Sequence, residues 1–178
     1  MNRETVVRWA LRVIFAVLGT LLVLGGAAAY LPYSLAYNHT ASLPAGFYLS
    51  EKISFDQIAH GDLVCFKREL PSWAEGRHYG VAGIDLCKQV LGLPGDLIER
   101  TAANRIQLTG AVGTWDGGAV LEIDSRGRVM VPAVHASPIP GNRLYAAMVH
   151  LPNSLDSRYL GLVRAEMVTR RIHPLVTW

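Results

Sequence analysis

The sequence has few cysteines and no arrangement of residues typical of a metal site. Its 178 residues include two cysteines, Cys65 and Cys87, without a CxxC motif and without histidines and cysteines at zinc spacing. We therefore expect no metal and no other cofactor. The sequence also has no long basic stripe with interleaved aromatic residues, and its formal net charge is only +3. Nucleic acid is therefore not an expected partner.

Long helical periodicity is scarce beyond residue 33, where short runs of β-type residues alternate with turn signals. The sequence predicts a mostly β fold with an antiparallel sheet. The predicted strands are 46–49, 62–67, 84–91, 97–100, 105–108, 119–123, 128–131, 144–150 and 159–163, with turns at 94–96, 116–118, 125–127 and 140–142. Residues 101–140, which are rich in glycine and short strands, predict a small inserted β subdomain.

A long apolar run occupies residues 13–31 and is interrupted by one strongly polar residue, Thr20. About twenty apolar residues in a helix are enough to cross a bilayer. Arg3, Arg8 and Arg12 precede this run, and no Lys or Arg follows it until Lys52. By the positive-inside rule, we expect a cytoplasmic tail at 1–12, a transmembrane anchor at 13–31 and an external domain at 32–178.

The same run also has the features of a cleavable signal peptide. Its last residues, Ala27, Ala28 and Ala29, are the small residues that signal cleavage favours. The run is longer than the apolar region of most signal peptides, which favours a retained anchor. Both readings place the domain on the outer side of a membrane.

Lys88 lies in a run whose alternation predicts an apolar strand face. In a strand over 84–91, Lys88 would share a face with Ile84, Leu86 and Val90. Burial on such a face disfavours the charged ammonium and lowers the pKa of the amine. A neutral lysine can act as a general base near pH 7. The alternative is an edge-strand lysine whose charged end reaches water.

The two cysteines have two open interpretations. Cys65 and Cys87 fall in neighbouring predicted strands, and an external compartment is oxidising, so they could form a disulfide. They could equally be two separate small core residues.

Four segments, read in order, resemble the type I signal peptidase superfamily and more closely its TraF-type conjugative transfer peptidases. These segments are YNHTASLPAGFY at 37–48, GDLVCF at 61–66, KQVLGLPGD at 88–96 and NSLDSRYLG at 153–161. The first fits the branch motif Asn-x-Thr-x-Ser-x-Pro-x-Gly-x-Tyr at every fixed position. The ending IHPLVTW at 172–178 is also similar, whereas residues 101–140 match only loosely.

The resemblance implies a signal-peptidase-like catalytic domain in which Ser42 is the nucleophile and Lys88 is the general base. It also implies that the Thr40 hydroxyl and the Ser42 backbone N–H form an oxyanion hole. Ser154 occupies the position of a hydroxyl that orients the lysine amine.

Asp156 and Arg158 match an acidic and a basic residue that support the catalytic strand, and in the TraF-type branch the acidic residue matters for activity. Without the resemblance, Asp156 reads as a turn cap, Arg158 as a surface residue and Ser154 as a turn residue.

Two departures weaken the resemblance to general leader peptidases. These enzymes usually have Arg after the lysine, where this chain has Gln89, and Met-Gly-Asp-Asn before the last motif, where this chain has residues 148–153. The expected function is a Ser/Lys endopeptidase that matures, and in some members cyclises, a conjugative pilin precursor at the periplasmic face of a bacterial inner membrane. Its expected partners are that substrate, the lipid bilayer and a transfer apparatus. The alternatives are a general leader peptidase and a non-catalytic membrane-tethered β module of a secretion complex.

Overall fold

The computed structural model describes residues 3–67, 69–77, 79, 85–133 and 135–178. The chain divides into two compact units, Met1–Ser34 and Leu35–Trp178. The first unit contains helix α1 (Arg3–Ala29). Its stretch Val6–Ala27 is long and apolar enough to cross a membrane. This stretch starts earlier than the predicted span, because the helix continues through the apolar residues that lie among the N-terminal arginines.

The single strongly polar residue of the apolar run is accommodated within α1. The Thr20 hydroxyl donates a hydrogen bond of 2.9 Å to the Ala16 carbonyl, one turn earlier. A hydroxyl satisfied in this way costs little in an apolar environment. Thr20 is therefore compatible with a membrane-spanning helix.

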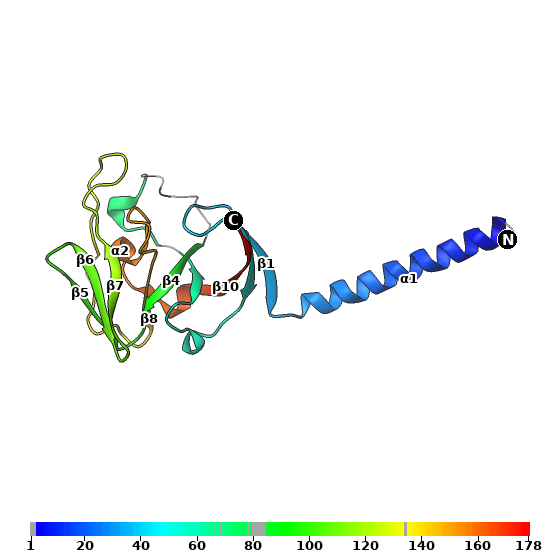
Figure 1. Ribbon diagram of the computed structural model, residues 1–178, viewed down its shortest axis with the longest axis horizontal. Helices are drawn as coiled ribbons and strands as arrows, with labels where there is room; N and C mark the ends of the chain where they lie inside the picture. Colours follow the sequence, from blue (N-terminus) through cyan, green and yellow to red (C-terminus); the bar gives the residue numbers. More distant parts are fainter. Residues whose placement is uncertain (1–2, 68, 78, 80–84, 134) are drawn as a thin grey trace. The chain divides into compact units, whose positions relative to one another are not determined.

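The second unit is built from two antiparallel sheets, which Figure 1 shows side by side. The seven-stranded sheet has the order β1-β2-β10-β3-β4-β8-β9, and the three-stranded sheet has the order β5-β6-β7. The strands of the large sheet are β1 (Tyr33–Asn38), β2 (Gly46–Glu51), β3 (Leu63–Phe66), β4 (Leu86–Gly92), β8 (Arg143–Ala147), β9 (Val163–Arg164) and β10 (Val168–Thr177). Those of the small sheet are β5 (Leu97–Arg100), β6 (Arg105–Gly110) and β7 (Gly113–Ala119).

Short helical turns complete the unit. They are α2 (Ser157–Leu160) and the 3-10 turns η1 (Phe55–Gln57), η2 (Ser72–Ala74) and η3 (Ala165–Met167). The predicted fold class, a mostly antiparallel β fold with a second small sheet and an N-terminal apolar helix, is confirmed. The small sheet belongs to the same compact unit as the large one.

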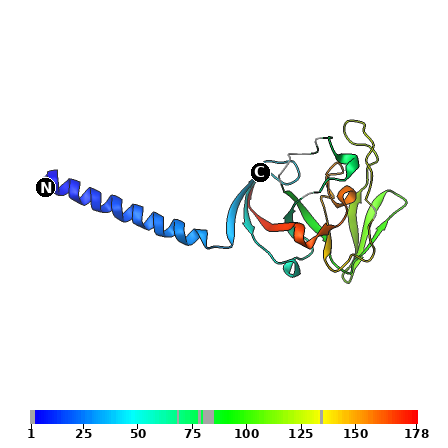
Figure 2. The same ribbon diagram turned by 180° about the vertical axis from the view of Figure 1, so that it is seen from behind.

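Several predicted elements are wrong in detail. The turn predicted at 116–118 lies inside β7. The strand predicted at 159–163 instead covers the last two residues of α2, two loop residues and the first residue of β9. Strand β10 was not predicted, yet it lies between β2 and β3 in the large sheet, where Figure 2 shows it in orange and red. Ile84, the first residue of the predicted Lys88 strand, falls outside the described residues.

The core consists of three clusters that share the strands of the large sheet. One packs the small sheet against β8 and α2 through Leu108, Ile106 and Tyr145. The second joins β3, β4 and β8 through Val64, Val90 and Ala146. The third lies beside the candidate site and contains Leu43, Tyr48, Cys65, Met148 and Ile172. Burial of these side chains supplies the main driving force for holding both sheets together.

Cys65 and Cys87 are joined by a disulfide. They are directly opposite each other in the antiparallel pairing of β3 with β4. The sequence left open a disulfide or two separate core residues, and the structure has the disulfide. The bond cross-links the two strands at the residue before Lys88.

Candidate active site

Lys88 lies in the middle of β4, between two strands of the large sheet. It is opposite Val64 of β3, and the burial pattern along β4 alternates, with Lys88 and Val90 on the buried face. The Lys88 residue is 2% exposed, so the predicted burial is confirmed. A buried ammonium is costly without an ion partner, and burial lowers the pKa of this amine to about 8.

Ser42 lies in the loop that connects β1 to β2, and hydrogen bonds and packing fix this loop at both ends. The Asn38 amide donates to the carbonyls of Thr40, Leu43 and Pro44, at 2.9–3.1 Å. The Tyr48 hydroxyl donates to the Pro44 carbonyl at 2.8 Å, and the Leu43 side chain is buried. These contacts hold the half-buried Ser42 in a defined position.

Gly46 closes the same loop at the start of β2. Its φ of 149° lies in a region that favours glycine, and an added Cβ would collide with the backbone of Val176 and Thr177. The glycine of the first motif is therefore explained by the close approach of β10.

The structure brings Ser42 and Lys88 into hydrogen-bond contact. The Lys88 Nζ lies 2.8 Å from the Ser42 Oγ. When the amine is neutral, the serine hydroxyl can donate to it across this distance. The pair therefore has the geometry in which a base removes a proton from a nucleophile.

Asp156 and Arg158 form a fully buried ion pair. The Arg158 Nη2 and Nε lie 2.7 and 2.8 Å from the two carboxylate oxygens. The carboxylate also accepts hydrogen bonds from the backbone N–H groups of Met148 and Arg158, so Asp156 caps the turn α2. The remaining guanidinium donors reach carbonyls such as those of Ala119 and Leu151.

This ion pair acts on Lys88 through its charges. The Asp156 carboxylate raises the pKa of Lys88, and the Arg158 guanidinium lowers it, both by less than burial does. Because the two charges oppose each other, burial remains the main influence on the amine. The surface location considered for Arg158 is wrong, since the residue is completely buried.

The other two predicted residues make different contacts from those expected. The Thr40 hydroxyl donates to the Asn38 Oδ1 at 2.7 Å, so it can reach an oxyanion only after leaving Asn38. The Ser154 Oγ is buried and has no hydrogen-bond partner among the described residues, Lys88 included. The Ser42 backbone N–H is likewise unpaired within the described part of the chain. The roles of Thr40 and Ser154 stay predictions.

A groove of about 440 Å³ contains the Ser42–Lys88 pair. Its lining includes the end of β1 with the loop after it, and residues 85–88 at and just before the start of β4. Tyr48, Cys65 and Ile172 also line it. An extended peptide is the shape that such a groove accommodates.

Sequence reasoning assigned no role to three residues of this site. Asn38 organises the serine loop, and the Asn-x-Thr spacing is a signal of the Asx turn that it forms. Asp85 and Arg170 also line the groove. No sequence signal joins these two, because Asp85 precedes β4 and Arg170 lies in β10, and they meet only through the sheet.

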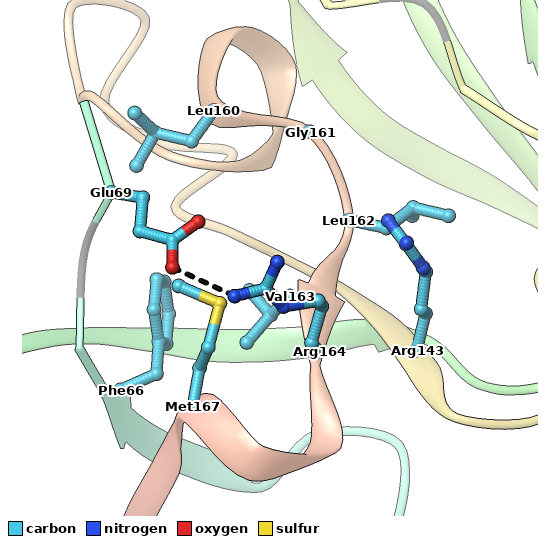
Figure 3. Close-up of a pocket in the computed structure, with 9 residues that line it drawn as sticks. All are labelled: Phe66, Glu69, Arg143, Leu160, Gly161, Leu162, Val163, Arg164 and Met167. Carbon is cyan, nitrogen blue, oxygen red and sulfur yellow. Dashed lines mark hydrogen bonds and ion pairs between the residues drawn. The ribbon is translucent and has the colours of Figure 1, made fainter. Parts of the chain in front are cut away.

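A second hollow, of about 120 Å³, lies beside β9. Figure 3 shows Glu69 and Arg164 joined across it, at 2.7 Å. Its lining has charged and apolar side chains but no serine, cysteine or neutral lysine. The described residues also include no group of His, Cys, Asp or Glu side chains that could hold a metal ion. The chemistry that these residues support is therefore centred on the groove.

A serine held against a buried lysine in the groove of a β domain is the arrangement of a serine peptidase. The family model described as signal peptidase, peptidase S26, matches residues 6–177, and this chain belongs to that family. A search of curated proteins found no match. Among solved structures, a signal peptidase I from Enterococcus faecalis matches 68% of this chain and 97% of its own. It has 17% sequence identity and a TM-score of 0.33, so it adds nothing to the family assignment.

Proposed function

We propose that this serine peptidase cleaves with Ser42 as nucleophile and Lys88 as general base. The observation that carries the proposal is the 2.8 Å contact between the serine hydroxyl and the amine of Lys88, a residue that is 2% exposed. Serine is a poor nucleophile near neutral pH and needs an adjacent base. A lysine whose pKa is lowered to about 8 is partly neutral at that pH and can serve as the base.

In the proposed reaction, the Ser42 Oγ attacks the scissile carbonyl while its proton moves to the Lys88 Nζ. The Ser42 N–H is available to stabilise the oxyanion, and a donor of this kind is typically worth about 3–4 kcal/mol. The protonated amine then donates its proton to the leaving nitrogen, which gives an acyl-enzyme. Water or an amine, activated by the neutral Lys88, resolves the ester and restores the Ser42 hydroxyl.

We further propose that the substrate is the membrane-bound precursor of a conjugative pilin. The support is the agreement of the first motif with the TraF-type pattern, together with Gln89 and residues 148–153, which depart from general leader peptidases. The matching family is described only as signal peptidase, peptidase S26, so a general signal peptidase is the second candidate.

The test is the mass of the product. Purified full-length protein in detergent is incubated with a candidate pilin precursor, and a mature chain of defined mass is the expected result. A product one water lighter than the linear chain would indicate cyclisation by aminolysis. Cleavage of many unrelated preproteins, with no preference for the pilin precursor, would contradict the pilin assignment and favour the second candidate.

We propose that the groove works on the outer face of a bacterial inner membrane, with α1 as the anchor. The distribution of arginines around α1 supports this orientation. Exposed aromatic residues of the second unit support a membrane surface nearby. Tyr37, Phe47 and Trp178 are each at least 41% exposed and lie within 6.4 Å of one another, centroid to centroid. Aromatic side chains favour the membrane–water interface.

Protease accessibility tests this orientation. Proteinase added to intact spheroplasts should degrade residues 35–178 of the expressed protein while a cytoplasmic marker survives. Protection of this part until the membrane is disrupted would contradict the orientation. The intact mass of the purified protein separates a retained anchor from cleavage after Ala29.

A further inference from the structure

The lining of the groove includes a pair of charges that the proposed chemistry does not use. Arg170 of β10 and Asp85, just before β4, both line the groove that contains Ser42 and Lys88. The Arg170 Nη2 lies 3.5 Å from the Asp85 Oδ2, which is a loose contact for an ion pair. The Asp85 carboxylate already accepts a hydrogen bond of 2.6 Å from the Thr169 hydroxyl.

Arg171, the next residue of β10, is an arginine whose guanidinium is paired with carboxylates of the protein. Arg171 is paired with Glu51 through its Nε at 2.7 Å and with Asp62 at 3.2 Å, and its side chain is 24% exposed. The Arg170 side chain is 44% exposed. Successive residues of a strand point to opposite faces, so these two arginines leave the sheet on different sides. Among the residues that the structure describes, Asp85 is the only side-chain partner of Arg170, so most donors of Arg170 can meet a ligand in the groove.

The two charges differ in how accessible they are to a substrate. The Asp85 side chain is 19% exposed and is fixed by Thr169, whereas the Arg170 side chain is 44% exposed and its one partner in the described part of the chain is 3.5 Å away. Lys88, the other basic residue in the lining apart from histidine, is buried and has a pKa near 8. A planar guanidinium binds carboxylates through paired hydrogen bonds. The accessible charge of the groove is thus positive and suited to a carboxylate.

The distance of the Asp85–Arg170 pair from Lys88 follows from the extended chain that leads into β4. Asp85 precedes Lys88 by three residues, and an extended chain advances about 3.3 Å per residue, which gives a separation of about 10 Å. An extended substrate beside β4 would cover this distance with roughly three residues.

We infer that Arg170, held from one side by Asp85, is a specificity subsite for an acidic side chain of the substrate, about three residues from the scissile bond. This inference rests on the proposed peptidase function of the same groove. The proposed subsite makes the enzyme selective for substrates with Asp or Glu at one position near the cleavage site.

The test is a set of substrate peptides in which Glu, Gln and Lys are placed in turn at each of the four positions on either side of the scissile bond. We expect Glu at one position to raise kcat/KM about fivefold over Gln, the effect of one partly exposed charge pair. Arg170→Gln should remove this preference, and Arg170→Glu should favour Lys instead. Arg171→Gln, the matched control on the opposite face, should keep the preference for Glu.

Binding to the Ser42→Ala variant, measured by fluorescence anisotropy with the same peptides, reads the subsite without turnover. A preference for Glu that depends on Arg170 in binding supports the subsite even if the proposed catalytic function fails. Equal binding and equal cleavage of the Glu, Gln and Lys peptides would overturn the subsite while leaving Ser42-dependent cleavage intact. A preference for Lys, or a preference for Glu that survives Arg170→Gln, would also overturn it.

Discussion

Replacing Ser42 with alanine should lower kcat for the precursor by at least about 10⁴-fold, the range seen when a peptidase loses its nucleophile. The substitution removes one oxygen from a half-buried loop residue, and the contacts of Asn38 and Tyr48 that fix the loop do not involve that oxygen. The fold should therefore survive. The measurement is the rate of product formation by mass spectrometry, beside the melting temperature of each protein in the same detergent.

Lys88→Met should lower kcat to a similar extent, since methionine keeps much of the length of the side chain but cannot accept a proton. The double variant Ser42→Ala, Lys88→Met should be no slower than either single variant, because residues that act as one unit lose their effect together. Stability should not fall, because the methionine removes a polar amine from a site that is 2% exposed.

Lys52→Met provides the matched control, since it removes one lysine from an exposed position outside the groove. This variant should retain wild-type kcat. If the Ser42 and Lys88 variants process the precursor as fast as Lys52→Met does, the Ser/Lys pair is not the catalytic centre.

Ser42 and Lys88 could each be predicted as candidate residues because the sequence signals around each of them are local. The alternation of apolar residues around Lys88 indicates a buried strand position, and the structure has the residue there. The motif around Ser42 contains Asn38 and Gly46, whose side-chain bonds and backbone angle shape the loop. The 46-residue separation between Ser42 and Lys88 could not be closed by local patterning, and only the resemblance linked the two.

The strands that were missed contain residues with strong turn or surface preferences. Gly117 and Gly118 read as a turn, but the pairing of β6 with β7 shifts register beside them, which makes a β-bulge. A Cβ on Gly117 would press on Ile106, so packing requires glycine within this strand. Strand β10 contains Pro174 and several charged residues, and its pairing on both sides outweighs these local preferences.

The charge pair in the groove shows a second limit of prediction from the sequence, which is contact between residues that are distant in the chain. Asp85 and Arg170 are far apart in sequence, and the two pairings β3–β4 and β3–β10 place β4, which Asp85 precedes, and β10, which contains Arg170, on the two sides of β3. Each residue alone reads as an ordinary surface charge. Their shared location depends on β10, which sequence patterning did not identify.

Breaking the ion pair between Asp156 and Arg158 should have the largest effect on stability. Both side chains are 0% exposed, so removal of either partner leaves a buried charge without its counterion. Arg158→Met or Asp156→Asn alone should destabilise the fold by about 3–5 kcal/mol, a large part of the stability of a domain this size. The double variant should recover part of this loss, because it buries no uncompensated charge. Denaturation of the full-length protein in detergent, followed by tryptophan fluorescence, measures these differences.

The same variants should move the pH dependence of activity in opposite directions, which a purely structural role would not do. In the wild type, kcat/KM should rise with pH through about 8, as the Lys88 ammonium loses its proton and becomes a base. Arg158→Met leaves the Asp156 carboxylate, which raises the pKa of Lys88, so the rise should move to higher pH. Asp156→Asn leaves the guanidinium, which lowers that pKa, so the rise should move to lower pH. Profiles that keep one midpoint in all folded variants would show that the pair holds the strand in place without tuning the amine.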